Sequence, residues 1–68
     1  MSVQVRLNGE SRELPDGTTL DAAVTALTAA PAGLAAAVNG DVVPRGSWAV
    51  TKLRDGDQVE VVTAVQGG

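Results

Sequence analysis

The 68-residue sequence predicts an α+β fold, in which a mixed sheet of four to five strands carries one helix packed across one face. Three observations support this prediction. Apolar and polar residues alternate near both ends of the chain, apolar residues recur at helical spacing in one stretch, and Gly, Asn, Asp and Pro separate the short apolar runs. A chain of this length has room for one small core, so we expect its helix to cover the sheet.

The first two strands are expected to form a hairpin. Apolar and polar residues alternate over Val3–Leu7, which predicts a strand with one buried face. Asn8 and Gly9 then indicate a tight turn, because both residue types tolerate a positive φ. A second short strand is expected over about residues 11–14, and residues 15–17 (Pro-Asp-Gly) end it as a turn.

The helix is expected to follow this turn. Thr18 is the predicted N-cap, and Asp21 three residues later takes the place of the Glu in a capping box. The next apolar residues are spaced i, i+3, i+4 and i+7 and share one helical face: Leu20, Ala23, Val24 and Leu27. We expect the helix to end near Ala29 or Ala30, because Pro31 disfavours helix in the residue before it. Such a stripe also suits a partner-binding helix, but a chain this small needs its only helix for the core.

Two more short strands are predicted in the middle of the chain. Residues 34–39 form a continuous apolar run, and its alanines make it ambiguous between helix and strand. We assign a strand because Gly33 precedes the run and a turn at residues 39–41 follows it. Val42 and Val43 then begin a short strand, which Pro44 keeps out of the middle of a sheet because proline has no N–H to donate.

The last part of the chain joins an irregular segment to the strongest strand signal. Residues 45–48 are expected to form an irregular or 3₁₀ connection, Leu53 to anchor a loop under the sheet, and residues 55–57 to form a turn. The strand over residues 58–65 divides its side chains between two faces: Val59, Val61, Thr63 and Val65 on one, and Glu60, Val62 and Ala64 on the other. The order β-β-α-β-β-β is the layout of the β-grasp, or ubiquitin-like, fold.

The composition excludes several classes of site. A net charge of −3 and the lack of a basic run argue against binding to nucleic acid or to an anionic membrane surface. The sequence contains no Cys and no His, which removes thiol chemistry, the usual zinc ligands and the usual neutral-pH base. Neither a signal-peptide pattern nor a membrane-length apolar stretch is present, so a soluble cytoplasmic protein is expected.

Few polar residues form a pattern typical of a site. Asp55, Asp57 and Glu60 suggest a cation site, but a turn and a solvated strand residue explain them better. Arg45 lies close to Trp48, the only aromatic residue, so the guanidinium is placed to stack on the indole. We interpret Trp48 as the largest contributor to the core and Arg45 as a partner contact. No residues that bind a metal or cofactor are predicted in this chain.

The sequence ends in Gly67 and Gly68, directly after a β-branched strand. A frayed end is the simplest interpretation of two terminal glycines. The alternative is a reactive terminal carboxylate, since residues without a Cβ can pass through a narrow channel and approach a nucleotide closely. We expect a single β-grasp domain over residues 1–65, followed by a flexible tail over residues 66–68, and on the glycines alone both interpretations of that tail, inert or reactive, stay open.

Two internal motifs make a family resemblance specific. Residues 38–48 read Val-Asn-x-x-x-Val-Pro-Arg-x-x-Trp, and residues 55–59 read Asp-Gly-Asp-x-Val. Together with the final Gly-Gly, they resemble the ThiS family, the sulfur carrier proteins of thiamine biosynthesis. The related MoaD family shares Asp-Gly-Asp and Gly-Gly, but its members are usually longer and lack the Pro-Arg-x-x-Trp segment. One departure from the family pattern is the Ala- and Pro-rich stretch over residues 29–37.

The resemblance implies a chemistry for the tail. A ThiF-like ATP-dependent adenylyltransferase would adenylate the Gly68 carboxylate, and sulfur from a donor protein would convert it to a thiocarboxylate. A ThiG-like thiazole synthase would accept this sulfur for the thiazole ring of thiamine. The chain is thus expected to be a co-substrate and not an enzyme, with ATP and Mg²⁺ used by the partner adenylyltransferase.

A carrier also needs a surface that its partners recognise. Val62 and Ala64 are predicted to point outward on the helix-free side of the sheet, beside the tail, and form a candidate contact patch. Val65 is the expected last ordered anchor, Gln66 the point where the tail departs, and Gly67 the residue that accompanies Gly68 into the partner.

Three alternatives remain open at the level of sequence. One is the small subunit of molybdopterin synthase, a MoaD-like sulfur carrier with a different acceptor. Another is a ubiquitin-like modifier that forms isopeptide bonds, and the last is an interaction domain with an inert tail. The Pro44-Arg45 and Trp48 segment favours the thiamine carrier over the first of these.

Overall fold

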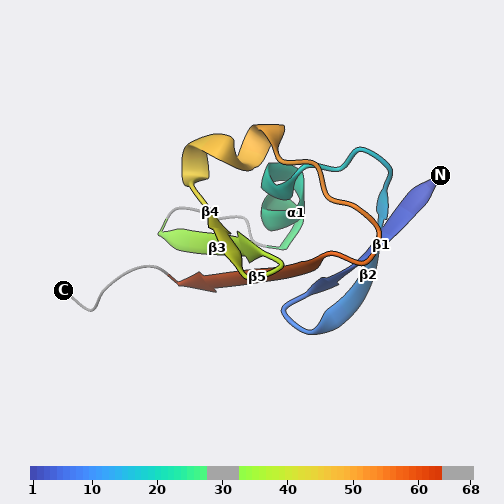
Figure 1. Ribbon diagram of the computed structural model, residues 1–68, viewed down its shortest axis with the longest axis horizontal. Coiled ribbons are helices and arrows are strands. Elements are labelled where there is room, and N and C mark those ends of the chain that lie inside the picture. Colours follow the sequence, from blue (N-terminus) through green and yellow to red (C-terminus); the bar gives the residue numbers. More distant parts are fainter. Residues whose placement is uncertain (28–32, 64–68) are drawn as a thin grey trace.

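The last strand of the chain, β5 (Gln58–Thr63), lies at the centre of the sheet. A computed structural model describes residues 1–27 and 33–63. The other elements, in chain order, are β1 (Ser2–Leu7), β2 (Glu10–Pro15), α1 (Leu20–Leu27), β3 (Leu34–Val38), β4 (Asp41–Val43) and the 3₁₀ helix η1 (Arg45–Val50). The sheet has five strands in the order β2-β1-β5-β3-β4, and α1 and η1 lie on one side of it (Figure 1).

The pairing of β5 makes the sheet mixed. β5 runs parallel to β1, with Arg6 opposite Gln58 and Leu7 opposite Val59. On its other edge it runs antiparallel to β3, from Val38 opposite Val59 to Leu34 opposite Thr63. The β1–β2 and β3–β4 pairs are antiparallel hairpins. The predicted α+β class and mixed sheet are therefore confirmed.

Both hairpins turn at an Asn-Gly pair, as the sequence predicts for the first of them. Asn8 and Gly9 have φ values of 53° and 85°, and Asn39 and Gly40 have φ values of 53° and 87°. Two consecutive positive φ angles match the right-handed twist of the strands they join. β2 is longer at both ends than the predicted 11–14, because its pairing with β1 continues from Glu10 opposite Leu7 to Pro15 opposite Ser2.

The predicted N-cap of the helix is wrong by one residue. The Ala22 N–H donates to Thr19 Oγ1 (3.2 Å), and the Ala23 N–H donates to the Thr19 carbonyl (3.0 Å), so Thr19 caps α1. The Thr18 hydroxyl instead donates to the Pro15 carbonyl (2.6 Å) and closes the turn before the helix. The expected helix end near residues 29–30 lies outside the described residues.

The core lies between the sheet and the layer formed by α1 and η1. Its buried apolar residues come from every element except β2 and β4 and from the loop after η1: Val3, Val5, Leu7, Leu20, Ala23, Val24, Ala36, Trp48, Leu53, Val59 and Val61. The predicted helical stripe is buried apart from Leu27, which lies at the end of α1 and is 36% exposed. Leu53 is buried as expected, and its N–H donates to the Thr18 carbonyl (2.9 Å).

Trp48 is the largest fully buried side chain, at 1% exposure. Its indole Nε1–H donates to the Val43 carbonyl (2.9 Å), which ties η1 to the end of β4. A buried indole needs such an acceptor, and here the last residue of β4 supplies it. The structural interpretation of Trp48 is confirmed, as is the 3₁₀ helix that carries it.

Within residues 1–27 and 33–63, no helix has the length and apolar character that crossing a membrane requires.

Truncation of Trp48 tests this account of the core. We expect Trp48→Ala to lower the free energy of unfolding by about 3–5 kcal/mol, because it empties the largest buried site. Trp48→Phe keeps most of the ring but leaves the Val43 carbonyl without its donor, at a cost of about 1–3 kcal/mol. Urea unfolding followed by circular dichroism measures both values.

Val50, in the same 3₁₀ helix, supplies the control because its side chain is 79% exposed. Val50→Ala should change the free energy of unfolding by no more than about 0.5 kcal/mol. Equal losses for Trp48→Ala and Val50→Ala would contradict the packing described.

Candidate functional site

The sheet face opposite α1 and η1, here named the open face, carries the apolar residues nearest to the predicted tail. Alternation along β5 buries Val59 and Val61, at 1% and 8% exposure, and turns Glu60 and Val62 outward. Val62 is 58% exposed. The predicted division of the β5 side chains between two faces is therefore confirmed for these four residues.

A shallow apolar groove crosses the open face over β3, β4 and β5. Residues paired directly across antiparallel strands share a face, so Ala35 accompanies Val62, and Ala37 accompanies both Glu60 and Val42. Small alanines therefore lie between two exposed valines, and Val42 is 74% exposed. We name this hollow the alanine groove; its lining is Ala35, Ala36, Ala37, Gly40, Val42, Glu60 and Val62.

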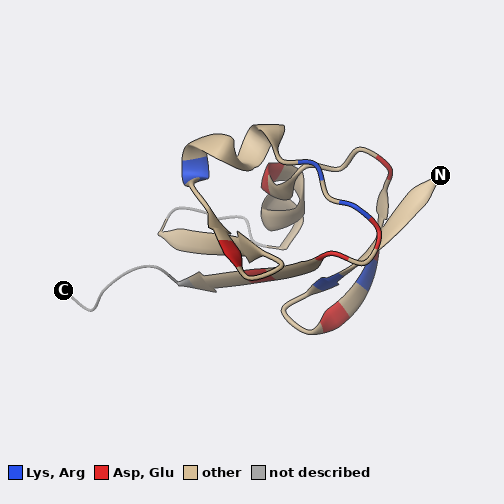
Figure 2. Ribbon diagram, in the orientation of Figure 1, with Lys and Arg blue, Asp and Glu red and all other residues tan. Residues whose placement is uncertain are grey.

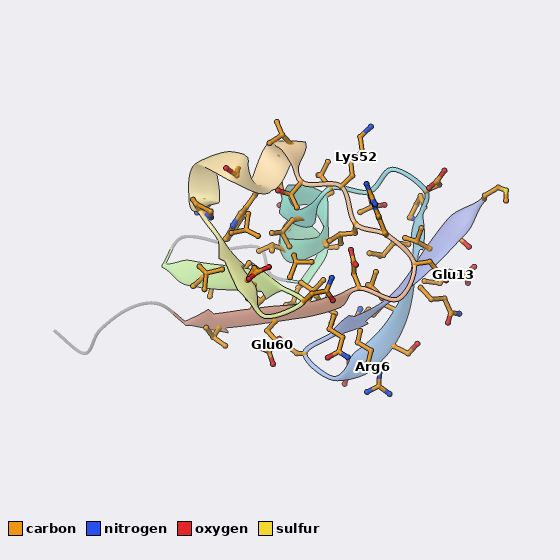
Figure 3. All side chains as sticks on the ribbon, viewed as in Figure 1. Arg6, Glu13, Lys52 and Glu60 are labelled. Carbon is orange, nitrogen blue, oxygen red and sulfur yellow. The ribbon has the colours of Figure 1, made fainter. Side chains whose placement is uncertain are left out.

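Glu60 is the charged residue that borders the alanine groove. Asp41 pairs with Val38 and so lies on the α1 side of the sheet, where η1 and the loop after it carry the basic residues Arg45, Lys52 and Arg54 (Figure 2). Figure 3 shows Glu60 and Arg6 projecting on the side away from α1, and Lys52 projecting on the opposite side. The alanine groove thus has a carboxylate at its border, which favours a partner surface with a basic group beside an apolar one.

Two asparagine side chains hold β5 from outside the strand. Asn8 accepts a hydrogen bond from the Val61 N–H (2.8 Å) and donates one to the Val61 carbonyl (3.2 Å). Asn39 accepts from the Gln58 N–H (2.9 Å) and donates to Asp57 Oδ1 (3.0 Å). The sequence pattern predicts both residues as turn formers only. The repeated choice of Asn, where Asp or Gly also suits the turn, was the available signal.

The acidic residues of the Asp-Gly-Asp motif are engaged in the loop itself. Asp55 Oδ1 accepts from the Gln4 N–H (2.7 Å), and Asp57 Oδ2 accepts from the Arg54 N–H (2.8 Å). These bonds tie the loop to β1 and close its turn, so the turn interpretation is confirmed. Across residues 1–27 and 33–63, no group of three or more His, Cys, Asp or Glu residues is arranged to hold a metal ion.

Arg45 lies over the indole, as its spacing suggested. The guanidinium carbon of Arg45 is 4.8 Å from the centroid of the Trp48 ring, within the range of a cation–π contact. Arg45 is exposed at the start of η1, on the α1 side of the sheet. The structure therefore does not bring Arg45 together with Val62, and a partner that contacts both must reach around β4.

The remaining predicted site residues are Ala64, Val65, Gln66, Gly67 and Gly68. They lie outside the described residues, and their roles stay predictions. The described part of the chain ends with Thr63 on β5, next to the alanine groove.

Comparison with known proteins decides the family. The ThiS family model matches residues 5–68, nearly the whole chain. This chain belongs to the ThiS family. The predicted resemblance and the β-grasp fold are confirmed.

The relatives include a sulfur carrier protein and two longer thiazole synthases. The chain is 32% identical over 66 residues to the sulfur carrier protein ThiS of Escherichia coli, covering 97% of this chain and 100% of that protein. It is 38% identical over 66 residues to a thiazole synthase of Magnetococcus marinus, covering 97% of this chain and 20% of the enzyme. A thiazole synthase of Paramagnetospirillum magneticum is 32% identical over 62 residues, and the match covers 91% of this chain and 19% of the enzyme. The chain thus spans about a fifth of each thiazole synthase.

The solved structures contain the same fold. The crystal structure of the thiamine biosynthesis protein ThiS from Geobacter metallireducens matches with a TM-score of 0.80 and 26% sequence identity. The match covers 97% of this chain and 100% of that one. The sheet and helix described above are therefore those of a ThiS-family protein.

Adjacent substitutions on β5 test the assignment of the open face. Val62→Asp places a carboxylate in solvent, and we expect it to lower the free energy of unfolding by no more than about 1 kcal/mol, the span of strand preferences. Val61→Asp places the same group in the core, where an unpaired charge is not tolerated, so the protein should be largely unfolded. Circular dichroism distinguishes the two results, and a folded Val61→Asp with an unfolded Val62→Asp would reverse the assignment.

Proposed function

We propose that this chain is a sulfur carrier that supplies sulfur for the thiazole ring of thiamine. The observation that carries the proposal is the extent of the family match, which runs through residue 68 and, against the E. coli carrier, covers that protein's whole length. The open face supports it, because an apolar groove lies beside the strand that precedes the Gly-Gly tail.

The reacting group in this proposal is the α-carboxylate of Gly68. A carboxylate is a poor electrophile because its negative charge is delocalised, so it must first acquire a leaving group. One carboxylate oxygen attacks the α-phosphorus of ATP, pyrophosphate leaves, and an acyl adenylate forms. A sulfur nucleophile then attacks the acyl carbon and expels AMP. With sulfide as the nucleophile, the product is the Gly68 thiocarboxylate. With a donor persulfide, the product is an acyl disulfide, and a second thiol of the donor must cleave its S–S bond, which leaves a disulfide on the donor and a thiocarboxylate on Gly68.

The chain is proposed to act as a co-substrate of partner enzymes and not as an enzyme. Its sequence has neither His nor Cys, so acid–base and nucleophilic groups for the transfer come from elsewhere. A ThiF-like adenylyltransferase would bind ATP and Mg²⁺, and a donor protein would supply the sulfur. Because the reaction consumes ATP, the cytoplasm is the proposed compartment.

A thiazole synthase is the proposed sulfur acceptor. Two relatives named thiazole synthase each contain a segment similar to this chain within one longer polypeptide. Covalent attachment raises the effective concentration of one domain near another, so it suits a carrier that delivers to that enzyme. These relatives favour the thiamine pathway over the molybdopterin alternative.

The tail and the alanine groove have different proposed roles. Gly67 and Gly68 have no Cβ, which allows close approach to the nucleotide inside the partner. Val65 is the proposed last anchor of the strand and Gln66 the point of departure. Val62 lines the groove, and Ala64 is proposed to continue this contact patch toward the tail, so docking there would place the tail at the partner's active site.

Arg45 is a proposed second contact, separate from the groove. Its guanidinium lies over the Trp48 ring and the residue is exposed, so a partner that approaches η1 can reach it.

Intact mass spectrometry tests the proposed chemistry. After incubation with ATP, Mg²⁺, an active ThiF-like adenylyltransferase and a sulfur source, the chain should gain the mass difference between one sulfur and one oxygen atom. Deletion of Gly68 should abolish the gain. An unchanged mass, with the partner shown to modify another ThiS-family carrier, would contradict the proposal. A Gly-Gly remnant on target lysines would support the modifier alternative instead.

A matched pair of charge substitutions tests the docking role of Val62. We expect Val62→Asp to raise the KM for the carrier in the adenylyltransferase reaction by about tenfold, as losing an apolar contact and adding a buried charge weakens binding. Val50→Asp introduces the same charge at a residue that is 79% exposed on η1, on the other side of the sheet. Its KM should stay within about twofold of wild type. Equal increases for both variants would refute the groove as the docking surface.

A further inference from the structure

Asn8 makes a contact on β5 that its role in the turn does not require. The residue leaves β1 at the first hairpin, with φ 53°, and its side chain reaches a strand that lies 53 residues away in sequence. There it binds both main-chain groups of one residue, the Val61 N–H at 2.8 Å and the Val61 carbonyl at 3.2 Å. A turn alone needs only the positive φ, which glycine also provides.

The Asn8 amide continues the β1–β5 ladder after the main chain of β1 has turned away. Main-chain pairing of the two strands ends at Leu7 opposite Val59, and the Asn8 N–H donates to the Val59 carbonyl (2.9 Å). A side-chain amide presents the same donor and acceptor as a peptide group. The Asn8 side chain therefore supplies the next pair of hydrogen bonds to β5, at Val61, in place of a further residue of β1.

The hydrogen bonds from Asn8 determine how far along its length β5 is bound on both of its edges. On the β3 edge, pairing continues to Leu34 opposite Thr63. On the β1 edge, the last contact within residues 1–27 and 33–63 is the one from Asn8 to Val61. Val61 is thus the last described residue of β5 with a partner on each side. Its side chain is 8% exposed and faces the core, while Val62 faces the alanine groove.

The distance from Val61 to Gly68 is limited by the chain. Gly68 lies seven positions after Val61 in the sequence, and these seven steps span at most about 23–25 Å at 3.3–3.6 Å per residue. The direction in which β5 releases the chain therefore determines the volume that Gly68 can reach. A looser Val61 would spread the carboxylate over a larger volume and lower the fraction of docked carriers aligned for attack on ATP.

We propose that Asn8 is a positioning residue for the Gly68 carboxylate: its amide holds Val61 and thereby directs the tail into the partner's nucleotide site. This inference rests on the proposed sulfur-carrier function. It assigns to the first hairpin a part in a reaction that takes place at the other end of the sequence.

Asn39 provides a matched comparison within the same fold. It has the same φ of 53° in the second Asn-Gly turn, and its side chain also binds β5. Its contacts are with Gln58 and Asp57, at the start of the strand and not near its end. Loss of either asparagine removes a pair of hydrogen bonds, but only Asn8 acts next to the tail.

The test compares Asn8→Gly with Asn39→Gly in the full chain. Glycine keeps the positive φ of each turn and removes only the side chain. The assay measures carrier-dependent release of pyrophosphate by a ThiF-like adenylyltransferase, below the melting temperature of both variants. We expect Asn8→Gly to lower kcat by about tenfold or more through misalignment of the reacting group. KM should be unchanged, because the alanine groove is intact, and Asn39→Gly should keep the wild-type kcat.

Amide hydrogen exchange supplies a readout that a general loss of stability would not give. In Asn8→Gly the Val61 amide should lose protection, while the Val62 amide, which faces β3, keeps it. Asn8→Asp retains the acceptor for the Val61 N–H but not the donor to the carbonyl, so its kcat should be intermediate. It also serves as the test variant if Asn8→Gly does not fold.

Three results would overturn the proposal. One is a wild-type kcat in Asn8→Gly although its Val61 amide has lost protection from hydrogen exchange. The same result in Asn8→Asp counts equally if Asn8→Gly does not fold. Another is an equal fall in kcat for the Asn8 and Asn39 variants. The third is that an active partner does not adenylate the wild-type chain at all. That result contradicts the sulfur-carrier function as well, whereas the first two results contradict only the role of Asn8.

Discussion

The central position of β5 is the constraint on which the rest of the structure depends. The last strand of the chain pairs with the first strand on one edge and with β3 on the other, so its inner side chains, Val59 and Val61, lie in the middle of the core. Alternation then forces Glu60 and Val62 onto the open face. The tail therefore follows the central strand of the sheet, whose described end lies next to an apolar groove. Both features suit a carrier whose reactive group is its own end.

Side-chain amides complete what the main chain leaves unpaired at both ends of β5. Asn39 holds the start of the strand through Gln58, and Asn8 holds Val61 after β1 has turned away. Each asparagine combines a left-handed turn conformation with hydrogen bonds to a distant segment: Asn8 makes both of its bonds to Val61 of β5, and Asn39 makes one to Gln58 of β5 and one to Asp57 before it. Side-chain hydrogen bonds from the two hairpin turns thereby hold the central strand at both ends, in a chain with room for only one small core.

Local sequence patterns predicted the elements and their faces but not their arrangement. The alternation of apolar and polar residues predicted which β5 side chains are buried, and the Asn-Gly pair predicted the first hairpin. Both patterns depend only on residues close together in the sequence. The parallel pairing of Arg6 with Gln58 joins distant parts of the chain, and no local pattern encodes it. Thr18 and Thr19 are equally good caps by type, and the choice depends on the bond from Thr18 to Pro15. The bond from Asn8 to Val61 likewise exists only once β5 is placed beside β1. The tail's role came from a family resemblance, which geometry alone would not have supplied.

The central claim is that the Gly68 carboxylate is the group that reacts. The most direct measurement labels both oxygens of that carboxylate with oxygen-18 and follows the label during turnover with ATP, a ThiF-like adenylyltransferase and a sulfur source. When sulfur displaces AMP from the acyl adenylate, the bridging oxygen stays with phosphorus. The account therefore predicts labelled AMP, formed in step with the thiocarboxylate. Thiocarboxylate formation accompanied by unlabelled AMP, or AMP formation that does not depend on the carrier, would contradict it.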